Sequence, residues 1–143
     1  MSADRAKLKR LRRLERLRSI ARQTALTEAA RAEATLAQVA SLEARTAALI
    51  DAYRLRRDAT TGAELQQAKG FVAGLTRIAD STAADLVRAR EAADARAAEA
   101  AEAERRRVAV DDRIEAARQR IARKAAENAQ PAAPSGPIGT PLE

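Results

Sequence analysis

Proline is confined to the last thirteen residues of this 143-residue chain, and this placement restricts the possible folds more than any other feature. A proline inside a helix removes a backbone hydrogen bond and clashes with the preceding turn, so a long proline-free stretch permits a long helix. Residues 1–128 contain no proline, whereas residues 131–141 contain all four, together with two of the five glycines. The sequence therefore predicts a helical body and a flexible tail over residues 128–143.

Bulky apolar side chains are too few for an ordinary globular core. Alanine supplies 39 of the hydrophobic residues, and the chain has one Phe, one Tyr and no Trp. A composition dominated by Ala, Arg, Glu, Leu and Lys is typical of long helices and coiled coils. We therefore expect an all-α protein built as a coiled coil.

One interruption of the helical body is expected near position 60, in the stretch DATTGAE. Thr61 followed by Glu64 fits a capping box, which satisfies the free backbone donors at the start of a helix. We expect helix one over about residues 4–57, a turn over about 58–61 and helix two over about 62–127. So short a turn makes the helices antiparallel, giving a two-helix hairpin over residues 1–127. The alternative is one continuous helix in a parallel dimer.

Heptad spacing predicts the seam between the helices. In helix one the predicted seam is Val39, Leu42, Thr46, Leu49 and Tyr53. In helix two the spacing extends over Val72, Leu75, Ala79, Thr82, Leu86, Ala89, Ala93, Arg96, Ala100, Ala103, Arg107, Val110, Ile114, Ala117 and Ile121. Folding near residue 60 places residue i opposite about residue 120 minus i. The stretch from Ala89 to Arg107 would then pack against the large side chains of Leu14, Leu17, Ile20 and Leu26.

The chain has no histidine and no cysteine. Their absence excludes imidazole proton shuttles, thiol nucleophiles, disulfides and zinc sites made of imidazole or thiolate ligands. We expect no enzymatic activity, no metal and no cofactor. Since no stretch approaches the ~20 uncharged residues of a membrane span, we also expect a soluble, cytoplasmic protein.

Basic residues cluster near both chain ends, where a hairpin would bring them together. Nine lie within the first 22 residues against two acidic ones, and eight lie between residues 105 and 124. Such a surface fits an acidic protein cavity, nucleic acid or anionic lipid, or is simply a solvated face. Nucleic acid is disfavoured because no aromatic residue interleaves the basic ones, and lipid because Trp and Phe anchors are missing.

The two aromatic side chains, Tyr53 and Phe71, flank the predicted turn. With Leu49, Leu75 and Ile78 they either hold the hairpin closed or form an apolar docking patch for another protein.

These features together resemble the FliJ family of flagellar export proteins and its injectisome relatives of the YscO type. The resemblance is carried by LIDAYRLRR, a short polar turn, and QQAKGFVAGLTRIADSTAADL, followed by the basic ending ERRRVAVDDRIEAARQRIARKAAE. It covers about residues 8–127, and residues 53–82 are its discriminating part. Leu49 and Thr82 stand where other members can carry larger or aromatic side chains.

The resemblance implies a non-enzymatic stalk of the type III export apparatus, peripheral at its cytoplasmic base. Family members sit in the pore of the hexameric export ATPase FliI, contact the export gate FlhA and recycle export chaperones. Carried over by position, the gate-facing residues would be Leu49, Tyr53, Phe71, Leu75, Ile78 and Thr82. The residues entering the ATPase ring would be Arg5, Lys7, Lys9, Arg10, Arg12, Arg13, Arg16, Arg118, Arg120, Arg123 and Lys124. The alternative function is a basic coiled-coil scaffold that binds nucleic acid.

Overall fold

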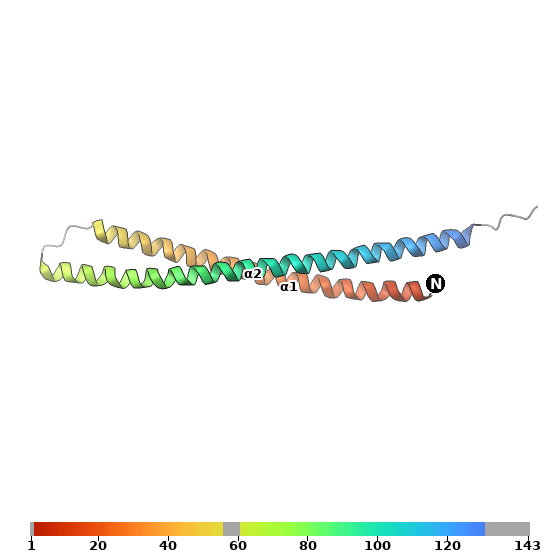
Figure 1. The fold of residues 1–143 in the computed structure, drawn as a ribbon, viewed down its shortest axis with the longest axis horizontal. Coiled ribbons are helices and arrows are strands. Elements are labelled where there is room, and N and C mark those ends of the chain that lie inside the picture. The colour runs from red at the N-terminus through yellow and green to blue at the C-terminus, as the bar shows by residue number, and fades with distance from the viewer. Residues whose placement is uncertain (1, 56–60, 131–143) are drawn as a thin grey trace, which may run out of the picture. The chain divides into compact units, whose positions relative to one another are not determined.

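The computed structural model describes residues 2–55 and 61–130, and these residues form two long helices. Helix α1 comprises Ser2–Leu55 and helix α2 comprises Gly62–Ala129, and they pack against each other as an antiparallel hairpin (Figure 1). The predicted all-α hairpin is therefore confirmed. Helix α2 continues two residues past its predicted end at 127. The predicted end of helix one at 57, positions 58–60 of the turn and residues 131–143 of the tail lie outside the described residues.

The side chain of Thr61 caps the start of α2, as its half of the predicted capping box requires. The backbone N–H of Glu64 donates to Thr61 Oγ1 at 3.1 Å, and the N–H of Leu65 donates to the Thr61 carbonyl at 3.1 Å. The Glu64 bond satisfies one of the four backbone donors that a helix start leaves free, and the Leu65 bond is the first i→i−4 bond of the helix. The sequence near position 60 thus encodes a helix start.

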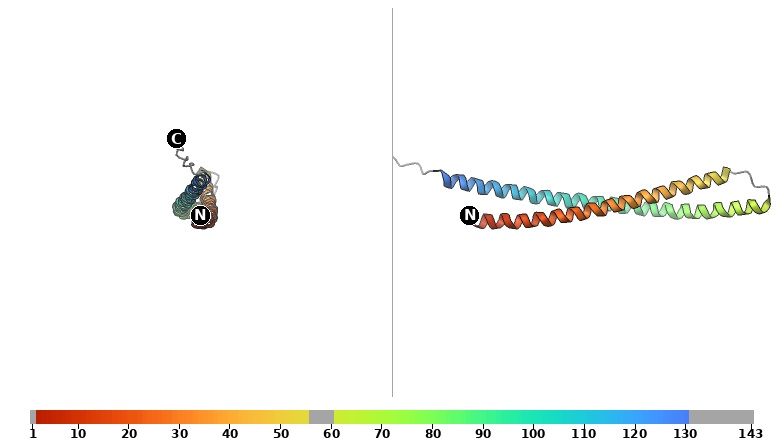
Figure 2. Two further views of the ribbon diagram at one scale, coloured as in Figure 1. Left: turned by 90° about the vertical axis from the view of Figure 1, so that its right-hand side faces the viewer. Right: turned by 180° about the vertical axis from the view of Figure 1, so that it is seen from behind.

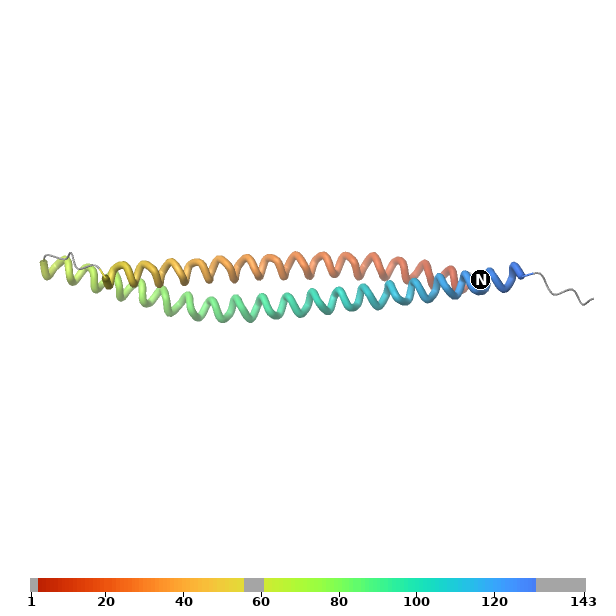
Figure 3. The backbone as a smooth tube through the Cα atoms, turned by 90° about the horizontal axis from the view of Figure 1, so that it is seen from above, coloured from red at the N-terminus to blue at the C-terminus, as the bar shows by residue number. Residues whose placement is uncertain are grey.

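Two compact units divide the described chain. The turn unit comprises residues 20–55 and 61–104, and the terminal unit comprises residues 2–19 and 105–130. In each unit a segment of α1 runs antiparallel to a segment of α2, as the views in Figures 2 and 3 agree.

The seam of α2 follows the predicted heptads. Fourteen of its fifteen predicted positions are buried or half-buried, and only Arg96 is exposed. Arg96 instead donates to the Glu99 carboxylate at 2.7 Å, which raises the pKa of the guanidinium above its ordinary value. The most deeply buried side chain, Ala93, is 1% exposed. Helix α2 therefore has one stripe along its seam, and six of the fifteen positions of that stripe are alanine.

The predicted seam of α1 is wrong at two of its five positions. Leu42 and Leu49 are about half exposed, and the neighbouring Glu43 and Ile50 take their places in the seam. The observed stripe is spaced 4, 3, 4, 3, and of the predicted positions it keeps Val39, Thr46 and Tyr53. The buried Thr46 hydroxyl donates to the Leu42 carbonyl at 2.8 Å, so its polar atom is satisfied inside the seam.

The observed stripe of α1 prevails because a helix in a hairpin presents one face over its whole length. The half-buried residues Ala29 and Leu36 belong to the observed stripe, whereas the predicted stripe continues through Glu28 and Thr35. Ala29 and Leu36 therefore favour the observed stripe, as Leu42 and Leu49 favour the predicted one.

The predicted packing of large against small side chains is also wrong. Leu17, Ile20 and Leu26 are exposed, and of the four predicted large partners only Leu14 is half-buried. In this stretch of the turn unit, half-buried alanines of α1 lie on the seam stripe, at Ala25, Ala29 and Ala32. Small side chains on both helices allow a close approach of the two backbones.

The register differs slightly from the predicted sum of 120. In the turn unit Tyr53 meets Phe71 and Arg22 meets Glu104, pairs whose residue numbers add up to 124 and 126. In the terminal unit Asp4 meets Lys124, a pair that adds up to 128. Since α1 ends at Leu55 and faces residues near 70, the first turns of α2 have no opposite partner within the described α1.

Candidate interaction surfaces

The terminal unit carries a strongly basic surface. Its described residues include sixteen basic and six acidic side chains, whereas residues 20–104 hold eleven basic and thirteen acidic ones. All eleven predicted ring-contact residues belong to the terminal unit and all are exposed. They are Arg5, Lys7, Lys9, Arg10, Arg12, Arg13, Arg16, Arg118, Arg120, Arg123 and Lys124. The positive charge of the whole chain is thus concentrated in this one unit.

One of these cations has an acidic partner across the two helices. Lys124 Nζ on α2 donates a hydrogen bond to Asp4 Oδ2 on α1. This hydrogen bond, followed by the charges of Lys124, the amino terminus and Arg120, holds the pKa of Asp4 below its ordinary value. The remaining ten predicted residues form no ion pair with another described residue, so their charge faces solvent.

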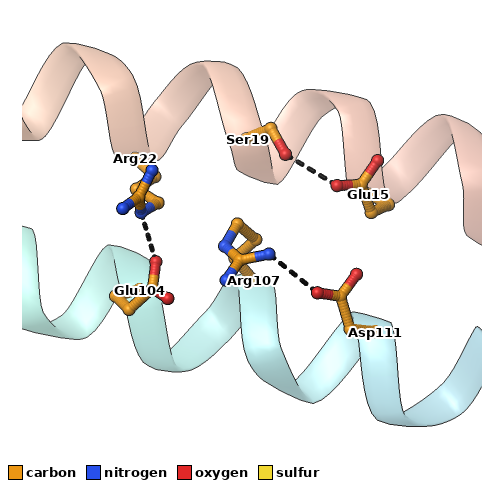
Figure 4. A network of polar contacts seen from close by, with 6 residues as sticks. All are labelled: Glu15, Ser19, Arg22, Glu104, Arg107 and Asp111. Carbon is orange, nitrogen blue, oxygen red and sulfur yellow. Dashed lines mark hydrogen bonds and ion pairs between the residues drawn. The ribbon is translucent and has the colours of Figure 1, made fainter.

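Three polar contacts lie among residues 15–22 of α1 and residues 104–111 of α2 (Figure 4). In the terminal unit Ser19 Oγ donates to the Glu15 carboxylate at 2.7 Å, and the Arg107 guanidinium donates to Asp111 at 2.7 Å. In the turn unit the Arg22 guanidinium reaches from α1 to the Glu104 carboxylate on α2. Arg22 and Arg107 occupy heptad positions of the seam, and both are half-buried. Polar residues at seam positions restrict the register in which two helices pair.

An apolar flank lies beside the seam of the turn unit. Each of its members directly precedes a seam position, and in an antiparallel pair such positions of both helices face the same side. The members are Leu42 and Leu49 on α1 and Phe71 and Ile78 on α2, and they are 46–49% exposed. We call these four residues the apolar flank. The positions that follow the seam on the opposite side are small or polar, at Ala47, Arg54, Thr76 and Ala83.

The six predicted gate-facing residues do not form one surface. Leu49, Phe71 and Ile78 are exposed on the apolar flank, whereas Leu75 is 8% exposed and Thr82 is 3% exposed inside the seam. Tyr53 is half-buried, and its ring lies 4.5 Å from that of Phe71 at an interplanar angle of 43°. The aromatic pair therefore closes the hairpin across the two helices. Leu75 and Thr82 cannot contact a partner while the seam is closed.

Leu42 is the flank residue that sequence reasoning missed. Heptad spacing predicts Leu42 in the seam, because it lies seven residues before Leu49. Its exposure of 49% places it on the surface instead. The signal that identifies it is the pair Ala29 and Leu36, whose heptad stripe continues through Glu43 and not through Leu42.

The described residues offer no site for a metal ion and no membrane span. Among the described residues no group of three or more acidic side chains is placed to hold a metal ion. Neither described helix has a stretch long and apolar enough to cross a lipid bilayer.

No protein-family model, curated protein or solved structure matched this chain.

Proposed function

We propose that the protein is a non-enzymatic stalk or adaptor of a type III protein export apparatus. Its basic terminal unit inserts into the pore of the hexameric export ATPase, at the cytoplasmic base of the apparatus. The turn unit contacts the export gate and export chaperones. The observation that carries the proposal is the exposure of all eleven predicted ring-contact cations within one compact unit.

The electrostatics of the terminal unit suit an acidic pore. Exposed charges on long side chains contribute little to the stability of the fold, but they attract an oppositely charged partner from a distance. Charge complementarity raises the association rate without demanding an exact side-chain fit. A helical hairpin with ten unpaired cations in this unit is suited to occupy a pore lined by carboxylates.

The proposed contact with the gate involves the exposed residues of the turn unit. Leu49, Phe71 and Ile78 can reach a partner directly, and Leu42 extends the same flank. Apolar side chains at helical spacing are the anchors by which a helix binds a groove. Leu75 and Thr82 support this surface from inside the seam.

The test is ATP hydrolysis by the hexameric export ATPase with increasing amounts of the full chain, in a buffer of low salt. We expect the wild-type chain to promote hydrolysis or ring assembly. The triple variant Arg12→Glu, Arg13→Glu and Arg16→Glu should lose this effect. The matched control Arg45→Glu, Lys69→Glu and Arg77→Glu makes the same change of net charge on exposed residues of the turn unit and should retain it. Equal behaviour of the two variants, or no effect of the wild-type chain, would refute the proposal.

The alternative is a basic scaffold that binds nucleic acid, and the same exposed cations support it. Binding by neutralisation of phosphates weakens steeply with salt. An electrophoretic shift of duplex DNA that persists with competitor polyanion and disappears in the first triple variant would favour this alternative. The export proposal predicts that competitor polyanion abolishes any such shift.

A further inference from the structure

We propose that the two helices of the turn unit pair in two registers. In the observed register Glu43 and Ile50 lie in the seam of α1. In the second register α1 is displaced by about four residues toward the turn, and Leu42 and Leu49 replace them. This exchange is a property of the chain itself and is independent of the proposed export function.

Helix α1 carries two overlapping heptad stripes. Both contain Ala25, Ala32, Val39, Thr46 and Tyr53. The observed stripe completes these with Arg22, Ala29, Leu36, Glu43 and Ile50, and the second with Ala21, Glu28, Thr35, Leu42 and Leu49. A heptad repeat defines one seam only where a single set of positions is apolar.

The two stripes of α1 are closely matched in apolar character. The second is more apolar at two of the five differing positions, where Ala21 replaces Arg22 and Leu42 replaces Glu43. The observed stripe is more apolar at two others, Ala29 and Leu36. The fifth exchange replaces an isoleucine with a leucine. Neither stripe therefore excludes the other on composition.

The geometry of the heptad sets the size of the displacement. A heptad seam alternates between a and d positions. When α1 uses its second stripe, the residues that both stripes share change from one kind to the other while α2 keeps its own stripe. This change requires a slide of about half a heptad, here four residues. In the observed register the residue numbers of two facing residues add up to about 125. In the second register they add up to about 121, so Leu49 faces Val72 and Leu42 faces Ala79. Four residues correspond to a movement of about 6 Å along the helix.

The start of α2 supplies the space for this movement. Residues 61–67 are all exposed, and Leu65 is 49% exposed although it lies on the continuation of the α2 stripe. In the second register Tyr53 faces Ala68, so α1 covers one more turn of α2. The slide thus buries apolar surface that the observed register leaves in water.

Two contacts within the turn unit oppose the slide. The observed register keeps Tyr53 against Phe71 and Arg22 against Glu104. Both Arg22 and Glu104 are about 40% exposed, and exposed ion pairs contribute little to stability. The ring contact is the larger cost, and against it the slide exchanges Ile50 for Leu49 and Glu43 for Leu42 in the seam. The balance gives two populated states, and a partner that binds the apolar flank selects the observed one.

Cysteine pairs distinguish the two registers, because the chain has no native cysteine. The pair Ile50→Cys and Leu75→Cys reports the observed register, and the pair Leu49→Cys and Val72→Cys reports the second. The control pair Ala48→Cys and Ala73→Cys lies on exposed positions of the same two helices. In a glutathione redox buffer we expect both seam pairs to form intramolecular disulfides at least about tenfold faster than the control. A Leu49–Val72 pair no faster than the control would overturn the proposal.

A distance measurement leaves the seam intact. Spin labels at the exposed positions Ala48 and Ala101 are separated along the axis by about 36 Å in the observed register and about 42 Å in the second. We expect two distance populations in the wild-type chain. The substitution Glu43→Leu should enrich the shorter one, because it makes the observed stripe more apolar. A single population in the labelled wild-type chain contradicts two registers.

Discussion

Truncation of Leu75 should destabilise the hairpin much more than truncation of Leu55. Leu75 is 8% exposed in the seam of α2, whereas Leu55 is 79% exposed near the end of α1. Each Leu→Ala change removes three carbon groups, worth about 0.8 kcal/mol each when fully buried. Scaled by the buried fraction, Leu75→Ala costs about 2.2 kcal/mol before any cavity term and Leu55→Ala about 0.5 kcal/mol. The small gain in helix propensity is the same for both.

Thermal unfolding followed by circular dichroism at 222 nm measures this difference. For a chain with 54 and 68 helical residues, 1 kcal/mol corresponds to about 3–5 °C in Tm. We expect Leu75→Ala to lower Tm by about 6–12 °C and Leu55→Ala by about 1–2 °C. Urea titrations with unchanged m-values check that unfolding remains two-state. Equal losses of Tm would refute the assignment of Leu75 to a buried seam.

Three further substitutions test single contacts. Removing the helix cap with Thr61→Ala should cost about 1 kcal/mol in urea unfolding, and Thr61→Ser should restore most of it. Because the pKa of Asp4 is lowered by Lys124, the contact stabilises the fold above about pH 3.8 and its contribution is lost as the pH falls through the lower folded pKa. The Tm of Asp4→Asn should therefore fall below that of the wild type at pH 6 and match it at pH 2. A double-mutant cycle on Arg22 and Glu104 should give a coupling below about 1 kcal/mol that decreases with added salt, and a larger, salt-independent coupling would contradict an exposed pair.

The sequence predicts α2 better than α1 for a physical reason. In α2 a single stripe is apolar, so residues from Val72 to Ile121 could be placed on the seam from spacing alone. In α1 two stripes compete, and a short window near the turn favours the one with Leu42 and Leu49. Only the full length of the helix, through Ala29 and Leu36, shows that the observed stripe is as apolar as the one with Leu42 and Leu49.

The candidate surfaces were predicted to different degrees. Exposure of the basic residues follows from charge alone, because an isolated cation is costly to bury. The apolar flank depends on which side of the seam each residue takes, and an error of one position moves a residue from surface to core. Leu75 and Thr82 lie in the seam, as heptad spacing predicts, and only the family resemblance assigns them to the gate-facing surface.

The antiparallel hairpin places the two basic segments of the chain in one unit. A disulfide between Leu11→Cys and Ile114→Cys tests this arrangement most directly. Both residues are half-buried in the terminal unit, at numbers that add up to 125. An antiparallel hairpin predicts an intramolecular disulfide and a monomer of altered mobility on a non-reducing gel. Disulfides formed only between two chains would contradict the hairpin, and with it the gathering of the cations on which the proposed function depends.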